Sequence, residues 1–164
     1  MAASIAIRKA TAQDAESIAE CLRQAFEPFR AQYTPDAFSD TVLSQEAVRQ
    51  RLLQMIVYAA VAAEGEIVGT VASSRDGLEG HLRGMAVRPP WQGRSVAMLL
   101  LQAAERDLLA AGCDRVTLDS TIPLERAASF YRRNGYILSG KINDFFGMPL
   151  LQYWKPLARH SGLD

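Results

Sequence analysis

Cysteine, histidine and unbalanced charge are scarce in this sequence, and each shortage argues against a class of protein. Two cysteines, Cys21 and Cys113, stand apart, with no CxxC pair and no histidine at metal-ligand spacing, so neither a disulfide framework nor a metal site is expected. We interpret them as buried, reduced thiols. Lysine plus arginine and aspartate plus glutamate number 18 each, so no net field attracts nucleic acid. We therefore expect no nucleic-acid partner.

Long apolar runs are also missing. No stretch is long enough to span a bilayer, and the first residues lack the basic segment, apolar run and cleavage site of a secretory signal. Since cysteine is rare as well, we expect a cytoplasmic protein without a membrane partner. A chain of 164 residues with 49% hydrophobic and 22% charged residues is typical of one globular domain. We assign that domain to residues 1–157 and a loose tail to residues 158–164.

Hydrophobic periodicity predicts one strand and two helices in the first third of the chain. The strand covers residues 4–8, and the first helix opens at a capping box from Thr11 to Asp14 and stops at Pro28. The second helix begins at Ser44 and runs to about Met55. The segment between the helices mixes aromatic residues with turn formers, and we expect it to lie over a site or a partner.

The rest of the chain predicts a meander of three strands, followed by two helices that alternate with strands. Gly84, inside the third meander strand, predicts a bulge or a close backbone approach. In order, the expected elements are strands at 56–63, 66–73 and 80–87, a mostly buried helix at 93–111, a strand at 115–118, a helix from 123 to 135, and strands at 136–141 and 148–154. The order β-α-α-β-β-β-α-β-α-β-β predicts an α/β (mixed α+β) fold, with about seven mostly antiparallel strands and helices on both faces.

The turn at residues 93–97 carries the clearest functional signal. It follows a strand ending at Val87 and two prolines, and it opens the long apolar helix. The first N–H groups of a helix lack partners and carry its positive dipole end, so they can bind phosphate. Gly93, Ser95 and Ala97 are small enough for a pyrophosphate to approach the backbone. Any helix start has such groups, so the pattern is also consistent with a purely structural turn.

Two motifs resemble those of the GNAT superfamily of N-acetyltransferases. Val-Arg-Pro at 87–89 followed by Gln-Gly-Arg-Ser-Val-Ala at 92–97 is similar to its acyl-CoA-binding motif, Gln/Arg-x-x-Gly-x-Gly/Ala, with Ser95 in place of the central glycine. Ala127 with Phe-Tyr-Arg-Arg-Asn-Gly-Tyr at 130–136 resembles the signature Ala-x-x-Phe-Tyr-x-x-x-Gly-Phe. Leu124 stands where the family often has an asparagine that bonds the pantetheine. The element order is also the GNAT order, so the resemblance covers nearly the whole chain.

The resemblance implies an N-acetyltransferase that transfers the acetyl group of acetyl-CoA to a primary amine of a small molecule or a protein. Acetyl-CoA would lie in a split between the strand ending at Val87 and the strand ending at Leu118, and no metal is implied. Ser120 or Thr121 would replace the missing asparagine. The implied cofactor-binding residues are Met85, Ala86, Val87, Gln92, Gly93, Arg94, Ser95, Val96, Ala97 and Tyr131.

Acetyl transfer needs an unprotonated amine and a proton for the departing thiolate. Tyr131 is the implied proton donor, because a phenol with a pKa near ~10 is protonated at neutral pH; a core tyrosine on the apolar helix face is the plain alternative. For the general base, His81 is our first candidate and Glu79 the neighbouring alternative. Asp119 and Glu125 are further candidate substrate contacts.

Several points stay open at the level of sequence. Ser95 and Leu124 leave room for a second function, a catalytically silent acyl-CoA sensor or scaffold. A dinucleotide-binding domain fits poorly, because Gly-x-Gly-x-x-Gly is absent and the meander precedes the loop. The aromatic segment 141–147 either walls the acceptor pocket or forms a plain turn, and exposed edge strands after Tyr136 would allow a homodimer. The acceptor itself depends on the variable region 26–44 and the final strands.

Overall fold

A seven-stranded sheet organises the computed structural model, which describes residues 4–158. The strand order is β1-β2-β3-β4-β5-β7-β6, and every neighbouring pair is antiparallel except β4 with β5. The strands are β1 (Ile5–Lys9), β2 (Ile56–Ala62), β3 (Ile67–Asp76), β4 (Glu79–Val87), β5 (Arg115–Thr121), β6 (Ile137–Phe145) and β7 (Met148–Pro156). The predicted fold class is confirmed, while the predicted tail lies outside the described residues except for residue 158.

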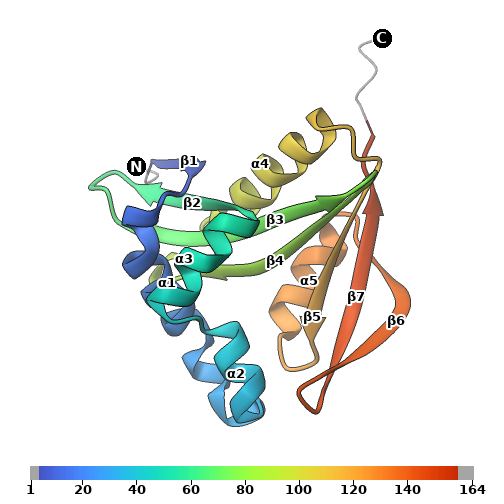
Figure 1. The fold of residues 1–164 in the computed structure, drawn as a ribbon, viewed down its shortest axis with the longest axis horizontal. Coiled ribbons are helices and arrows are strands. Elements are labelled where there is room, and N and C mark those ends of the chain that lie inside the picture. The colour runs from blue at the N-terminus through green and yellow to red at the C-terminus, as the bar shows by residue number, and fades with distance from the viewer. Residues whose placement is uncertain (1–3, 159–164) are drawn as a thin grey trace.

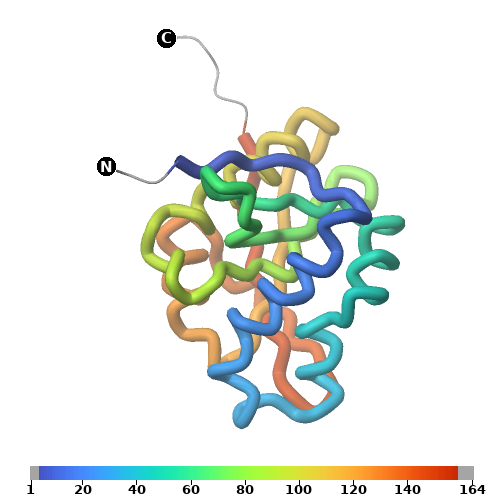
Figure 2. Tube along the Cα trace, turned by 90° about the vertical axis from the view of Figure 1, so that its left-hand side faces the viewer, coloured from blue at the N-terminus to red at the C-terminus, as the bar shows by residue number. Residues whose placement is uncertain are grey.

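Helices cover both faces of this sheet, α1–α3 on one side and α4 and α5 on the other (Figure 2). Within the described range they are α1 (Ala15–Phe26), α2 (Pro35–Thr41), α3 (Gln45–Gln54), α4 (Val96–Ala110) and α5 (Glu125–Arg133), with 3-10 segments η1 (Ala12–Asp14), η2 (Glu27–Gln32) and η3 (Pro89–Trp91). Each face packs its own hydrophobic cluster against the sheet, which is why the central strands are apolar on both sides.

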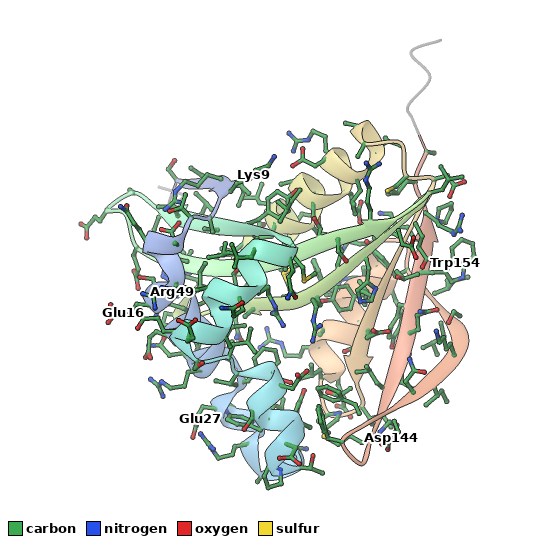
Figure 3. All side chains as sticks on the ribbon, viewed as in Figure 1. Lys9, Glu16, Glu27, Arg49, Asp144 and Trp154 are labelled. Carbon is green, nitrogen blue, oxygen red and sulfur yellow. The ribbon has the colours of Figure 1, made fainter. Side chains whose placement is uncertain are left out.

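Charged side chains such as Glu16, Glu27 and Arg49 extend from the outer surfaces of the helices (Figure 3). None of the helices among residues 4–158 combines the length and the apolar character that crossing a membrane would need.

Local capping explains why the first helices begin where the sequence predicts. The Thr11 N–H donates to Asp14 Oδ2 at 2.8 Å, which closes the capping box ahead of α1. Ser44 Oγ accepts from the Ala47 N–H at 3.1 Å and starts α3.

Several elements differ from the prediction. Helix α2 was not predicted, because Pro35 and Asp36 were interpreted as turn residues; Thr34 caps it through a 3.2 Å bond from the Ala37 N–H. Helix α4 begins at Val96 rather than at residue 93, since Gly93 and Ser95 adopt left-handed φ values of 79° and 66°. Strands β5, β6 and β7 also continue beyond their predicted ends, to residues 121, 145 and 156.

Strand β4 contains the predicted bulge, and this bulge lies where β4 leaves β5. Ala72 pairs with Arg83 while Thr70 pairs with Ala86, so β4 carries one extra residue around Gly84, whose φ is 70°. On the other side of β4, pairing with β5 covers only residues 79–82 against 115–118. Beyond that point the two parallel strands diverge (Figure 1). The sheet is therefore split at its centre.

Candidate active site

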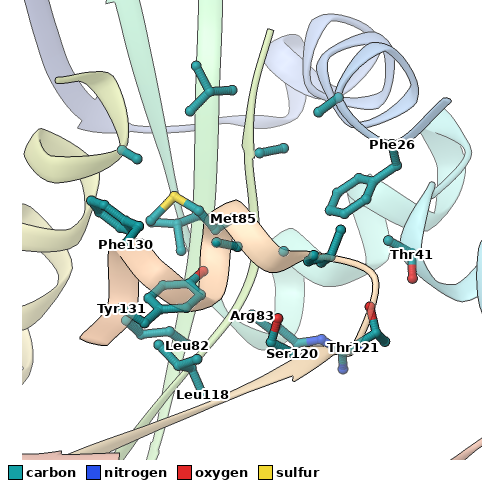
Figure 4. Close-up of a pocket in the computed structure, with 18 of the residues that line it drawn as sticks. Phe26, Thr41, Leu82, Arg83, Met85, Leu118, Ser120, Thr121, Phe130 and Tyr131 are labelled. Carbon is teal, nitrogen blue, oxygen red and sulfur yellow. The ribbon is translucent and has the colours of Figure 1, made fainter. Parts of the chain in front are cut away.

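A cleft of about 810 Å³ opens at this split. Because successive residues of a strand point to opposite faces, β4 and β5 each contribute side chains to both sides of the sheet. The side next to α5, here called the α5 side, is lined by Met85, Leu118, Phe130 and Tyr131. The side next to α1, here called the α1 side, is lined by Phe26, Tyr33, His81, Arg83 and Asp119. Figure 4 shows Tyr131 beside Phe130, Leu82 and Leu118, with Phe26 and Thr41 across the cleft.

Unpaired backbone N–H groups lie at one end of the cleft, in the turn before α4. Among residues 4–158, no acceptor bonds the N–H groups of residues 93–98, and the first bond of the helix runs from Leu99 N–H to Ser95 O at 3.1 Å. Gly93, Ser95, Val96 and Ala97 all line the cleft. With the positive end of the α4 dipole behind them, these groups are available to bind an anion.

The predicted turn residues divide into those that leave the backbone open and those that hold the turn in shape. A Cβ built on Gly93 would meet no atom within 4 Å, so a ligand can approach its backbone closely. Gln92 lines the cleft, but its side-chain amide donates to Val87 O at 3.0 Å. Arg94 does not line the cleft, and its guanidinium lies over the Trp91 ring at 5.4 Å. The groups of the turn that remain available to a phosphate are therefore backbone amides.

Tyr131 lies on the α5 side within an aromatic cluster. Its ring centroid is 5.5 Å from that of Phe130, 5.8 Å from Tyr136 and 6.3 Å from Tyr153. The residue is only 7% exposed, and burial raises the pKa of its phenol above the ordinary value. Its hydroxyl bonds to no other described residue, although the residue lines the cleft. A protonated phenol that is free to donate is therefore available there.

His81 and Asp119 face each other on the α1 side. His81 Nδ1 bonds Thr117 Oγ1 at 2.8 Å, and its Nε2 lies 3.5 Å from Asp119 Oδ2. Burial lowers the pKa of His81 below its ordinary value, while the Asp119 carboxylate partly offsets this effect. The imidazole is therefore neutral near pH 7 and can accept a proton.

The structure does not bring Glu79 to the cleft. Its carboxylate pairs with Arg115 Nε at 3.3 Å, at the outer end of β4 where β4 and β5 are still hydrogen-bonded. Among residues 4–158, no cluster of three or more histidine, cysteine or acidic side chains has the arrangement of a metal site.

Two buried polar atoms in the cleft have no hydrogen-bond partner among the described residues: Asp119 Oδ1 and Ser120 Oγ. Leaving such atoms unpaired is costly, so both are available to bond a ligand in the cleft. Ser120 is one of the two residues predicted to replace the asparagine missing at Leu124. Phe145 and Phe146 also line the cleft, which supports the predicted aromatic wall over the plain turn.

Sequence reasoning missed Arg51, which reaches the cleft from α3. In the sequence it is one of several arginines in a polar helix, with nothing to distinguish it from Arg49. The available signal was Gly84, whose predicted close approach is made by this side chain: a Cβ built on Gly84 would lie 2.7 Å from Arg51 Nη1.

Comparison with known proteins gives this geometry a context. The sequence pattern of the Acetyltransferase (GNAT) family matches residues 15–136. Among solved structures, the fold is similar to a PaiA N-acetyltransferase of Thermoplasma acidophilum in complex with coenzyme A, at 20% identity over 93% of this chain and 99% of that one, with a TM-score of 0.78. A GNAT-family acetyltransferase of Staphylococcus aureus matches at 20% identity, 94% and 100% coverage and a TM-score of 0.77. The ribosomal-protein-S18-alanine N-acetyltransferase of Escherichia coli matches at 13% identity, 98% and 99% coverage and a TM-score of 0.76.

Proposed function

The chain belongs to the GNAT acetyltransferase family and is an acetyl-CoA-dependent N-acetyltransferase, and on that premise we propose that a primary amine attacks the acetyl thioester directly within the cleft. The observation that carries the proposal is the split between β4 and β5, which gives Tyr131 and His81 access to one cavity from opposite sides of the sheet. The α5 side then takes the acetyl-CoA and the α1 side takes the amine.

The proposed acetyl-CoA site uses the backbone more than side chains. The pyrophosphate binds the free N–H groups of residues 93–98, and the pantetheine arm pairs with the edge of β4 at Met85, Ala86 and Val87, which β5 leaves unpaired. Ser120 Oγ, buried and without a partner, bonds the same arm. The apolar lining of the α5 side keeps water away from the thioester.

The proposed reaction removes two protons from the acceptor nitrogen and delivers one to sulfur. The incoming ammonium is attracted to Asp119 and loses its first proton to His81, whose lowered pKa suits a neutral base. The amine nitrogen then bonds to the acetyl carbon, the nitrogen of the tetrahedral intermediate releases its second proton to solvent, and the intermediate collapses by breaking the carbon–sulfur bond. Tyr131 donates its phenolic proton to the departing thiolate, so that the products are the acetylated amine and free CoA.

We extend the proposal to the setting of the enzyme. Free, buried Cys21 and Cys113 fit a reducing compartment such as the cytoplasm. Residues 1–157 act as one domain, and the balanced charge gives no reason to invoke nucleic acid. Strand β6 forms an edge of the sheet with Ile137 57% and Ile142 65% exposed, which suits a homodimer contact.

The first test is a calorimetric titration with acetyl-CoA, followed by a thiol-release assay across a panel of primary amines. We expect saturable one-site binding and amine-dependent release of CoA. Tight binding with no release on any amine would contradict turnover and favour the sensor. Absence of binding would contradict the assigned acetyl-CoA site.

A further inference from the structure

Arg51 is a cation in the cleft without a carboxylate partner. Among residues 4–158, no acidic oxygen lies within 4.0 Å of its guanidinium and no hydrogen bond engages it. The neighbouring Arg83, by contrast, pairs with Asp40 at 3.3 Å. Burial and the repulsion of Arg83 lower the pKa of Arg51 to about 10, although the attraction of Asp40, whose carboxylate pairs with Arg83, partly offsets this, so Arg51 is still charged at neutral pH. A partly buried, unpaired charge is costly, and an anionic ligand would offset that cost.

The backbone of β4 makes room for this side chain. Gly84 lies at the bulge with φ 70°, and a Cβ at that position would come within 2.7 Å of Arg51 Nη1. The bulge therefore aligns the α3 arginine with the α1 side of the cleft, three residues along β4 from His81. Since an extended strand advances about 3.3 Å per residue, Gly84, the residue that Arg51 approaches, lies roughly 10 Å along β4 from His81.

The charges on the α1 side match a ligand that carries both signs. Asp119 has an unpaired buried oxygen beside His81, and Arg51 has an unpaired guanidinium at the other end. Phe26, Tyr33 and Phe145 line the same cleft and offer apolar contact to a carbon chain that joins the two groups. A neutral amine or a simple polyamine would satisfy Asp119 and leave Arg51 without a partner.

We propose that Arg51 binds a carboxylate of the acceptor, so that the enzyme acetylates small amino acids whose amine and carboxylate are separated by several bonds. This inference rests on the proposed function, because it assumes that the amine lies at Asp119 and His81. The planar guanidinium donates two parallel N–H bonds to the carboxylate.

The test compares ω-amino acids, from glycine through β-alanine to ε-aminocaproate, each beside its own carboxamide. In the wild type we expect kcat/KM for the longer acids to exceed that for their amides by at least about 10-fold, a size typical of a charge-assisted hydrogen bond. Arg51→Gln should remove this preference without changing the KM for acetyl-CoA, and Arg51→Lys should retain part of it. Arg49→Gln is the control, since Arg49 lies on the same helix, 45% exposed and paired with Glu46.

The outcomes separate this inference from the proposed function. Acetylation of amines with no preference for acids, or a preference that survives Arg51→Gln, would overturn the carboxylate site and leave N-acetyl transfer intact. If no amine is acetylated, the proposed function fails. Calorimetry on the acetyl-CoA-saturated protein then tests the carboxylate site at Arg51 by itself. Binding of ε-aminocaproate that Arg51→Gln abolishes would still support the site; absence of binding would overturn it.

Discussion

The two sides of the cleft differ in how they handle charge, although the same two strands build them. On the α5 side the lining is apolar, and Tyr131 presents a hydroxyl without a partner among the described residues. On the α1 side, the lining carries five ionisable side chains: Asp40, Arg51, His81, Arg83 and Asp119. The difference teaches that an apolar side suits a neutral thioester held by backbone groups, whereas the polar side suits an amine that must be recognised and deprotonated.

The largest effect is expected on the α5 side, from Tyr131→Phe. Loss of the proton donor should lower kcat by about 10²- to 10³-fold, while the Kd for acetyl-CoA stays unchanged because binding uses the backbone. Thermal stability should also stay unchanged, because the lost hydroxyl bonds no described residue. Tyr58→Phe is the control: it removes a 2.7 Å bond to Asp107 away from the cleft and should cost about 1 kcal/mol of stability with normal turnover. Undiminished turnover in Tyr131→Phe would reject its role.

The second-largest effect is expected on acetyl-CoA binding, from a carboxylate introduced beside the backbone N–H groups of the turn before α4. Gly93→Asp should raise the Kd for acetyl-CoA by about 10²-fold, since a fixed negative charge repels the pyrophosphate. Gly65→Asp supplies the comparison, because Gly65 also has a left-handed φ, 90° against 79°, and open space around it. The two variants should lose similar thermal stability, and only the first should lose affinity in calorimetry. If the two variants bound acetyl-CoA with equal affinity, the assignment of the pyrophosphate to the turn before α4 would be wrong.

The α1 side is tested through the pH profile. Activity should fall as pH falls through the pKa of His81, which burial holds below its ordinary 6.5, because protonation removes the base. His81→Ala should lower kcat/KM by about 10- to 10²-fold at neutral pH and abolish this acid limb. Asp119→Asn should move the limb to still lower pH, since the Asp119 charge raises that pKa. An acid limb unaltered in His81→Ala would assign the base to another group or to solvent.

The smallest effect is expected at Ser95. Two substitutions there separate the effect of backbone strain on stability from the effect of the hydroxyl on acetyl-CoA binding. Its φ of 66° costs an L-residue about 1 kcal/mol, so Ser95→Gly should stabilise the fold by up to about 1 kcal/mol in chemical denaturation. Ser95→Ala keeps the strain but removes the hydroxyl. If the hydroxyl donates to a phosphate, the alanine variant should bind acetyl-CoA several-fold more weakly. If Ser95→Gly lowered the free energy of unfolding, the left-handed φ of Ser95 would not be a source of strain.

How much could be predicted differs between the two sides of the cleft. Most elements follow from periodicity, caps and turn residues, which act over a few neighbouring positions, as the Thr11 box and the Ser44 cap illustrate. Helix α2 was missed, although Thr34 and Pro35 carry its start signal, because Pro35 and Asp36 were interpreted as turn residues. The motifs around Gly93 and Tyr131 are local, so both residues could be proposed from the sequence, and both line the cleft. Arg51 could not be proposed from the sequence, because its place in the cleft depends on the contact between its side chain, which comes from α3, and the bulge at Gly84 in β4.

The sequence by itself determined the order of the seven strands along the chain, the glycine-bearing turn before α4 and the tyrosine on α5, because each depends on neighbours along the chain. Only the tertiary structure decided that β4 and β5 part after residue 82, that His81 meets Asp119 while Glu79 turns to Arg115, and that Arg51 has no carboxylate partner among the described residues. These facts depend on contacts between residues far apart in the chain, where burial and pairing set the charge and the pKa of each group.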